Sequence, residues 1–198
     1  MKQLFTLAAI LLLTITVNAQ RTSYVSIAGF TTQTAMPFSK FTGLFKNVVH
    51  PGAEIGYGKN FEQKNKHQWF LELKFAYFFH RFVQHGIPVY LNFGYRYKIS
   101  NKFSAETAIG AGYMHSIPAT AKLKLDGNGN YKNNKGIGRM QAMATYSLGL
   151  GYTIHPATAR PVSLFTVYQQ RIQMPFVKSY VPLLPYNSLL VGIKKTIK

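Results

Sequence analysis

The chain has 198 residues, no cysteine and a formal net charge of +18 at pH 7. Its length suits one domain, and the lack of cysteine excludes disulfides, thiolate metal sites, cysteine nucleophiles and lipid attachment through a cysteine. The basic residues are scattered over turns, loops and alternating positions, with no basic helix and no zinc motif. The charge therefore does not indicate a nucleic-acid-binding protein.

The first residues have the pattern of a secretory signal peptide. Met1-Lys2-Gln3 is a short basic start, residues 4–17 are an apolar run, and Val17-Asn18-Ala19 carries small or permissive residues before a cleavage site. The run is shorter than the roughly 20 residues that a membrane-spanning helix needs. We expect residues 1–19 to be a cleaved signal peptide and residues 20–198 to form one domain.

Beyond the signal, apolar and polar residues alternate in segments of about ten residues. In the clearest segment Trp69, Leu71 and Leu73 share one parity, and Glu72 and Lys74 share the other. A period of two predicts a strand with two chemically different faces. Such strands are predicted in chain order at Thr22–Phe30, Pro51–Phe61, Gln68–Arg81, Pro88–Ile99, Lys102–His115, Met140–Ile154, Val162–Ile172 and Ser188–Ile197.

The strand pattern favours a membrane barrel. After the signal no apolar run reaches helix-spanning length, and the mean hydropathy is −0.03. Only helices and closed barrels satisfy every backbone polar group in lipid, and bacterial barrels of one chain have an even number of strands. We predict an all-β fold, a single closed, antiparallel, eight-stranded up-and-down transmembrane β-barrel.

The predicted connections differ in length on the two sides of this barrel. One side has Thr31–His50, Phe82–Ile87, Ser116–Gly138 and Gln173–Asn187, and the other has Glu62–His67, Ser100–Asn101 and His155–Pro161. Outer-membrane barrels have short periplasmic turns and longer extracellular loops, so we assign the first group to the outside. The segment Asp126-Gly127-Asn128-Gly129-Asn130 is expected to be a flexible polar loop tip.

Aromatic residues on the outward parity gather at both ends of the strands. Such belts place amphipathic rings at the two lipid–water boundaries. The predicted periplasmic belt contains Tyr57 or Phe61, with Trp69, Tyr97, Phe103 and Tyr152, and the predicted outer belt contains Tyr77, Phe79 and Tyr113.

The inward parity carries most of the acidic residues. The interior of an eight-stranded barrel is just wide enough to be filled by side chains, and buried charges need partners. We therefore expect a filled lumen held by an ion-pair network of Glu54, Glu72, Lys74, Arg96, Lys98, Glu106, Arg171 and Lys194. A proton or ion path through these charges is the alternative. Room for the long basic chains is expected at Gly56, Gly94, Gly110, Gly112, Gly149 and Gly151.

Lysines in the first and third outward loops are candidates for contacts with anionic headgroups. The six are Lys40, Lys46, Lys122, Lys124, Lys132 and Lys135. They are placed to contact the phosphates of lipopolysaccharide, and ordinary solvated loop lysines are the alternative.

No chemistry-bearing motif stands out. His80 and His85 lie five residues apart across a turn, which is poor spacing for metal ligands, and no cofactor motif is present. His115 and Ser116 are adjacent on a strand, so they point to opposite faces and the histidine does not serve as a base for the hydroxyl. We expect no metal, no cofactor and no catalytic residue.

The chain resembles the small eight-stranded outer-membrane barrels of the OmpA/OmpX type. The resemblance rests on the signal ending Val17-Asn18-Ala19-Gln20, on the strand Gly52-Ala53-Glu54-Ile55-Gly56-Tyr57-Gly58, and on Gly149-Leu150-Gly151-Tyr152. It implies the outer membrane of a Gram-negative bacterium, contact with its lipid and lipopolysaccharide, and assembly by the barrel-insertion machinery. The implied role is non-enzymatic: envelope integrity, adhesion or ligand binding through the outward loops.

Two alternatives remain open, an outer-membrane lipid A-modifying hydrolase or acyltransferase, and a soluble secreted ligand-binding β-barrel. The chain departs from the resemblance at its end. Such barrels often finish in an aromatic residue, whereas this chain ends Lys194-Lys195-Thr196-Ile197-Lys198.

Overall fold

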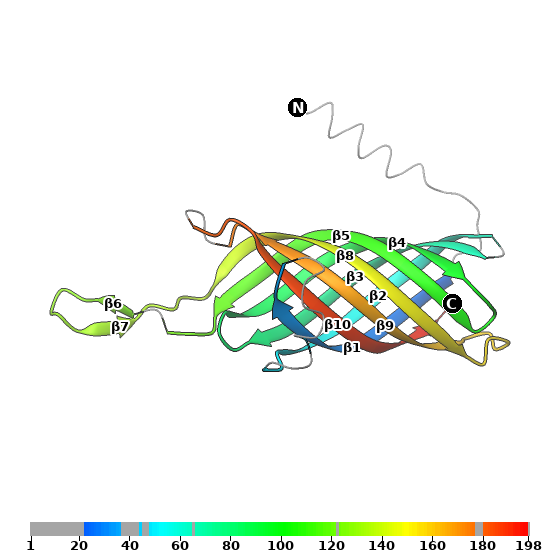
Figure 1. Ribbon diagram of the computed structural model, residues 1–198, viewed down its shortest axis with the longest axis horizontal. Coiled ribbons are helices and arrows are strands. Elements are labelled where there is room, and N and C mark those ends of the chain that lie inside the picture. Colours follow the sequence, from blue (N-terminus) through cyan, green and yellow to red (C-terminus); the bar gives the residue numbers. More distant parts are fainter. Residues whose placement is uncertain are drawn as a thin grey trace, which may run out of the picture.

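Eight long antiparallel strands form a closed barrel in the neighbour order β1-β10-β9-β8-β5-β4-β3-β2 (Figure 1). The computed structural model describes residues 22–36, 44, 48–64, 66–121, 123–176 and 180–197, so the signal predicted at residues 1–19 lies outside the described residues. The barrel strands are β1 Thr22–Thr34, β2 Pro51–Lys64, β3 His67–His80, β4 Gln84–Lys98, β5 Phe103–Pro118, β8 Arg139–Ile154, β9 Val162–Met174 and β10 Leu184–Thr196. The described part of the chain contains no helix long and apolar enough to cross a bilayer.

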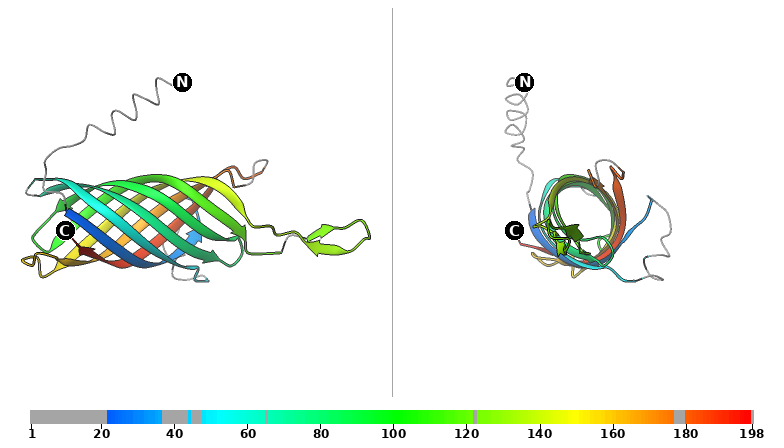
Figure 2. Two further views of the ribbon diagram at one scale, coloured as in Figure 1. Left: turned by 180° about the vertical axis from the view of Figure 1, so that it is seen from behind. Right: turned by 90° about the vertical axis from the view of Figure 1, so that its left-hand side faces the viewer.

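Pairing between β1 and β10 closes the barrel. Their register runs from Tyr24 opposite Thr196 to Thr34 opposite Tyr186, and the barrel is round when viewed along its axis (Figure 2). Closure leaves no unpaired strand edge inside a membrane. The predicted eight-stranded up-and-down barrel is confirmed.

Several strands are longer than predicted on the side of the long loops. β1 continues to Thr34 instead of ending at Phe30, β4 begins at Gln84 instead of Pro88, and β10 begins at Leu184 instead of Ser188. The part of a strand that extends beyond the lipid needs no continuous apolar outer face. The apolar–polar alternation that predicts a strand is therefore lost there. Hydrogen bonds to the neighbouring strands continue there, and these bonds extend the barrel.

The third outward loop contains a second, small sheet that the sequence analysis missed. β6 (Leu123–Leu125) pairs with β7 (Tyr131–Asn133), and the hairpin projects from the end of the barrel (Figures 1 and 2). The expected polar tip between them is organised by Asp126, whose Oδ1 accepts hydrogen bonds from the backbone N–H groups of Asn128 (2.9 Å) and Asn130 (3.0 Å). These backbone donors and Lys132 lower the pKa of Asp126.

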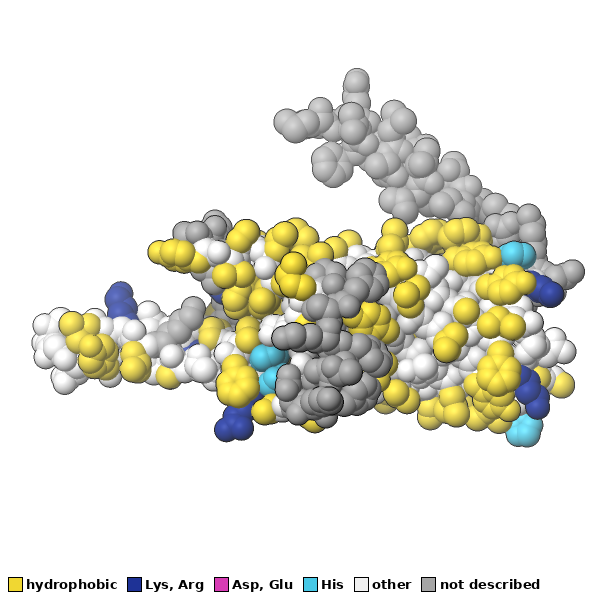
Figure 3. All heavy atoms as spheres, in the orientation of Figure 1, with side chains coloured by type: hydrophobic (Ala, Val, Ile, Leu, Met, Phe, Trp, Pro, Cys, Tyr) yellow, Lys and Arg dark blue, Asp and Glu magenta, His cyan; other side chains and the backbone are white. Residues whose placement is uncertain are grey.

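The two faces of the barrel wall are oriented as predicted. Leu73, Phe93 and Leu148 are 53%, 43% and 42% exposed on the outside, whereas Glu72 is 3% exposed and Arg96 9% exposed. On the face seen in Figure 3, hydrophobic side chains spread over the wall, and lysine and arginine lie near its two ends and on the hairpin. An apolar outer wall around charged inner residues is the arrangement of a barrel surrounded by lipid.

The lumen contains more aromatic side chains than the sequence analysis expected. Phe70, Phe78 and Tyr90 point inward with the charged residues, together with Tyr24, Phe30 and Tyr186. Glycines on adjacent strands make room for these rings: a Cβ at Gly94 would lie 2.2 Å from Phe70, and one at Gly86 would lie 2.2 Å from Phe78. The prediction that the six inward glycines leave room for long basic chains is therefore wrong: an aromatic ring occupies the space at Gly94, and the nearest atoms at the other five also belong to residues other than lysine and arginine.

Candidate functional site

The middle of the lumen contains a buried ion-pair network built on Lys74. Its Nζ lies 2.7 Å from Oε1 of Glu54 and 3.7 Å from Oε2 of Glu72. The Ser26 hydroxyl donates a hydrogen bond to Glu72 (2.6 Å), and the Tyr90 hydroxyl donates to Glu54. β1 to β4 supply these residues, so the network ties together four neighbouring strands.

Arg171 joins this layer without touching a carboxylate of the described residues. It is 1% exposed, and its Nη2 donates to Gln169 (2.8 Å), whose own Nε2 donates to the Tyr90 hydroxyl (3.1 Å). The guanidinium carbon also lies 5.5–5.9 Å from the ring centres of Phe30, Phe78 and Tyr90, within the range of cation–π attraction. The layer thus holds two carboxylates and two cations, and its formal charge is zero.

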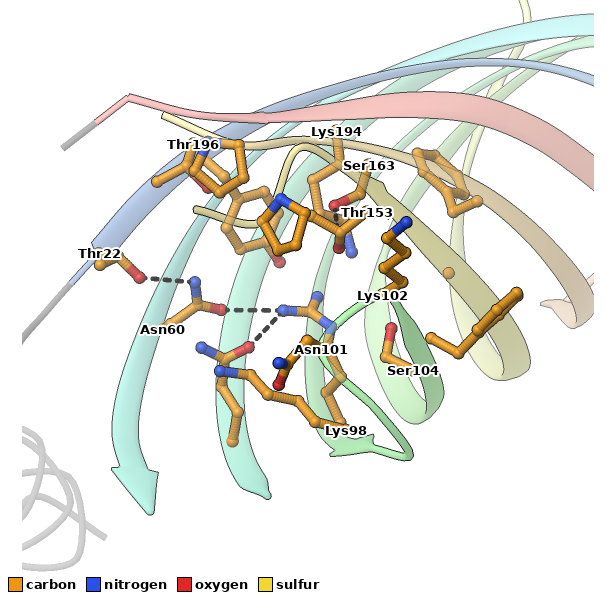
Figure 4. Close-up of a pocket in the computed structure, with 18 of the residues that line it drawn as sticks. Thr22, Asn60, Lys98, Asn101, Lys102, Ser104, Thr153, Ser163, Lys194 and Thr196 are labelled. Atoms are coloured by element: carbon orange, nitrogen blue, oxygen red, sulfur yellow. Dashed lines mark hydrogen bonds between the residues drawn. The ribbon is translucent and has the colours of Figure 1, made fainter. Parts of the chain in front are cut away.

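A second network lies nearer the short turns. Oε2 of Glu106 accepts hydrogen bonds from Arg96 Nε (2.9 Å) and Lys194 Nζ (3.1 Å). Nη1 of Arg96 donates to Gln68 (2.6 Å) and Asn60 (3.3 Å), and Asn60 donates to Thr22 (2.9 Å), as Figure 4 shows in part. Seven of the eight residues expected in the lumen network belong to these two networks.

Lys98 is the exception, because its side chain makes neither an ion pair nor a hydrogen bond with the residues that the structure describes, whereas Arg171 is held by hydrogen bonds. Its side chain lines a cavity of about 520 Å³ at the short-turn end of the barrel, together with Lys102 and Lys194 (Figure 4). The expectation of a completely filled lumen is wrong at this end. The turns at Ile99–Lys102 and His155–Pro161 surround the opening without filling it.

The outward end of the lumen contains an amide network that sequence analysis missed. Gln84 Nε2 donates to Gln173 (2.6 Å) and to the Tyr186 hydroxyl (2.9 Å), and Ser116 donates to Gln84. Gln173 in turn donates to Gln141. Amides give no charge signal, and Gln84, Ser116, Gln173 and Tyr186 were assigned to loops. Had the strands been extended by a few residues, the same period-two alternation would have placed these side chains in the lumen.

His115 and Ser116 do not form a nucleophile–base pair. Nε2–H of His115 donates to the carbonyl of Ile137 (2.8 Å), so its Nδ1 accepts from the Tyr113 hydroxyl (2.7 Å). Ser116 is buried on the opposite face, where it donates to Gln84. This arrangement provides no general base for the serine hydroxyl.

The two histidines on either side of the second loop, His80 in β3 and His85 in β4, point to opposite faces of the wall. His80 is buried against His50, whereas His85 lies on the outer wall and makes a hydrogen bond with Tyr77 (2.9 Å). No group of three or more metal-ligating side chains occurs in the described parts of the chain.

The outward aromatics lie on the outer wall at both ends, as their parity requires. Trp69 stacks on Phe93 with ring centres 5.2 Å apart, and Phe103 packs against Tyr152 at 5.0 Å. Tyr57 and Tyr97 are also exposed on this wall, and Phe79 packs on His85 at the other end. Histidines make hydrogen bonds with outward tyrosines in three places, His67–Tyr95, His85–Tyr77 and His115–Tyr113. The residue pattern of the sequence did not indicate a role for these histidines.

No family model and no curated protein matches the chain. Among solved structures it is similar to Neisserial surface protein A, with a TM-score of 0.55 and 9% identity over 89% of this chain and 97% of that one. It is also similar to Ail of Yersinia pestis in complex with the heparin analogue sucrose octasulfate (TM-score 0.49, 12% identity, 91% and 100% covered) and to the outer membrane enzyme PagL (0.44, 12%, 86% and 97%). At these identities the similarity concerns the fold.

The chain folds as a small outer-membrane β-barrel. The resemblance to barrels of the OmpA/OmpX type is thus confirmed at the level of the fold. The apolar wall and the aromatic residues at both of its ends are the arrangement of a barrel that spans a membrane. From loop length alone, as in outer-membrane barrels, we assign the rim of short turns to the periplasmic side and the β6–β7 hairpin to the outer side.

The described loop lysines of this barrel lie on or beside the hairpin. Lys124 and Lys132 are paired across it, Lys132 lies 3.1 Å from Asp126, and Lys135 donates to the carbonyl of Ala119 (3.2 Å). Lys40, Lys46 and Lys122 lie outside the described residues. The hairpin carries its lysines away from the barrel rim (Figure 1).

Proposed function

We propose that this protein is a non-enzymatic outer-membrane barrel whose outward loops bind the phosphate groups of lipopolysaccharide. The four outward segments of the chain carry many basic residues and a single acidic residue, Asp126. The basic residues are Lys40, Lys46, Arg81, Lys122, Lys124, Lys132, Lys135 and Lys178. So strong an excess of positive charge attracts polyanions at the cell exterior.

The pairing of Lys124 with Lys132 supports this proposal most directly. The two residues are directly opposite each other on β6 and β7, and like charges in that position repel. Asp126 lies 3.1 Å from Lys132 and offsets part of this repulsion, and an anion beside Lys124 would offset the rest. The neighbouring Leu123, Leu125 and Tyr131 are exposed on the hairpin, so the hairpin combines apolar and cationic side chains suited to an amphiphile with a phosphorylated headgroup.

The test is binding of detergent-purified protein to lipopolysaccharide micelles. A variant with the six loop lysines at 40, 46, 122, 124, 132 and 135 changed to glutamine should bind at least about tenfold more weakly, since each exposed ion pair contributes about 0.2–1 kcal/mol. The control is Lys59→Gln/Lys195→Gln, which removes charge from the outer wall at the periplasmic end. Unchanged binding by the six-fold variant contradicts the proposal. Competition by free polyphosphate separates phosphate recognition from capture of the acyl chains.

A further inference from the structure

We propose that the periplasmic cavity is a binding site for a compact, multiply charged phosphate-bearing ligand. The cavity is formed by the ends of β4, β8 and β10 and by the turns around Lys102 and Pro156. It lies at the opposite end of the barrel from the outward loops, and the inference is independent of any role of those loops.

The charge balance of the lining residues is the first reason. Four cations face this space, Arg96, Lys98, Lys102 and Lys194, and Glu106 is the single carboxylate among the lining residues. Glu106 is already shared between Arg96 and Lys194. Four positive charges and one negative charge leave an excess of three positive charges around about 520 Å³ of open space.

This excess is specific to the cavity. In the middle layer of the same lumen Lys74 pairs with Glu54 and Glu72, and the buried Arg171 balances the second carboxylate without contacting it. The barrel therefore neutralises its buried charges where it is closed and leaves them in excess where it is open. Clustered cations with one shared carboxylate are stabilised by an anion that enters from solution.

Two buried donors without partners are the second reason. Nη2 of Arg96 and the hydroxyl of Tyr24 make no hydrogen bond with the residues that the structure describes. Arg96 is 9% exposed and Tyr24 is 1% exposed, and both line the cavity. Buried polar atoms without partners are rare in native proteins and point to a ligand or water. Two nitrogens of Arg171 in the middle layer also lack partners among the described residues, so the charge excess is what distinguishes the cavity.

The rest of the lining indicates phosphate rather than a hydrophobic anion. Hydroxyl and amide groups surround the opening, as Figure 4 shows. They belong to Thr22, Asn101, Ser104, Thr153, Ser163 and Thr196. Phosphate oxygens accept charge-assisted hydrogen bonds from lysine and arginine and neutral ones from hydroxyls, so this donor set fits a pyrophosphate or sugar-phosphate group. The same chemistry would fit the headgroup of an anionic phospholipid in the inner leaflet.

Titration calorimetry of the detergent-purified full chain with inorganic pyrophosphate tests the site. Lys98 and Lys102 make no side-chain ion pair with described residues, so Lys98→Gln/Lys102→Gln should keep the barrel folded and weaken pyrophosphate binding at least about tenfold. Glu106→Gln removes the single carboxylate and should tighten binding. Lys195→Gln, which removes a lysine from the outer wall at the same end, should leave binding unchanged.

The binding measurements with the native protein and the double lysine variant decide between the outcomes. Absence of pyrophosphate binding by the native protein, or equal binding by the double lysine variant, overturns the proposal. Heat-modifiable migration on gels shows whether the Glu106→Gln variant is folded. If it is not folded, the binding measured with the lysine variants alone tests the proposal. Nanodiscs with and without phosphatidylglycerol distinguish the two sources of the ligand. If this lipid weakens pyrophosphate binding, the ligand is a lipid headgroup. If pyrophosphate binding is the same in both nanodiscs, the ligand is a soluble phosphate.

Discussion

The ring of Phe70 on β3 lies over Gly94, its direct partner on β4, so that a Cβ at residue 94 would come within 2.2 Å of the ring. The same relationship holds between Phe78 and Gly86 on these strands. The Phe70 ring also lies 4.8 Å from the guanidinium carbon of Arg96. The glycine thus fixes the position of a ring that packs against the periplasmic ion-pair network.

We predict that Gly94→Ala destabilises the barrel by about 1–3 kcal/mol, the usual cost of overpacking a filled interior. Urea unfolding in detergent micelles measures the change. Gly29→Ala is the matched control, because nothing lies within 4 Å of a Cβ at that position. Adding Phe70→Leu to Gly94→Ala should restore part of the loss. Equal stability of the two alanine variants would contradict this packing argument.

Removal of Lys74 should be more costly. Lys74→Met leaves the carboxylates of Glu54 and Glu72 buried without their shared cation, and breaking a buried ion pair from one side costs about 3–5 kcal/mol. The free energy of unfolding in lipid vesicles is the measurement. Lys74→Met/Glu54→Gln should be more stable than Lys74→Met, because the amide removes one unpaired charge and still accepts from Tyr90. The opposite order of stability would argue against a charge effect.

Trp69 reports on the position of the membrane, because it is the single tryptophan of the chain and lies 37% exposed on the outer wall. We expect its fluorescence to be quenched more strongly by lipids brominated near the headgroup than by lipids brominated near the chain ends, as for an interfacial aromatic. Iodide in the aqueous phase should quench weakly. Strong quenching by iodide with no effect of brominated lipid is the result expected of a soluble barrel.

His50 should make stability depend on pH. Its ring stacks on His80 with centres 3.7 Å apart, and its Nδ1 accepts from the backbone N–H of Arg81 (3.3 Å). Burial lowers the pKa of His50 below its usual 6.5. The unfolded chain therefore binds this proton first as pH falls through 6.5, and the contribution to stability is lost between that pH and the lower folded pKa.

Urea midpoints compared between about pH 7.5 and pH 5 measure this loss, since the usual titration of histidine falls in that interval. His50→Gln should show a smaller decrease. His155→Gln, at an exposed histidine of the short turn after β8, should behave like the native protein. An identical decrease in His50→Gln would assign the pH dependence to other groups.

The sequence predicted the fold well because lipid imposes a continuous rule on the outer wall. Leu71, Leu73 and Phe75 face outward on one parity, and this period-two signal revealed the strands without knowledge of their neighbours. Beyond the lipid, outward residues no longer need to be apolar, and the period-two signal is lost. The outer ends of β1, β4 and β10 and the β6–β7 hairpin were therefore missed, although backbone pairing continues through them.

The contacts between side chains in the lumen were harder to predict from the sequence. Parity placed Glu72, Lys74 and Arg96 inside, yet it gave no indication that Phe70 and Phe78 pack over glycines or that glutamines from β4, β8 and β9 form one network. Such contacts join residues far apart in the chain. They depend on register and on the volume left by neighbouring strands, neither of which a single strand specifies.

The alternation of residues along each strand determined by itself which side of the wall meets lipid, since that choice depends only on each side chain's affinity for water. The tertiary structure decided which inward charges neutralise each other. Lys74 lies between two carboxylates, whereas Lys98 lies at an opening beside cations that share one carboxylate. The physical reason is that Coulomb attraction depends on distances across the lumen, and those distances exist only after the barrel has closed.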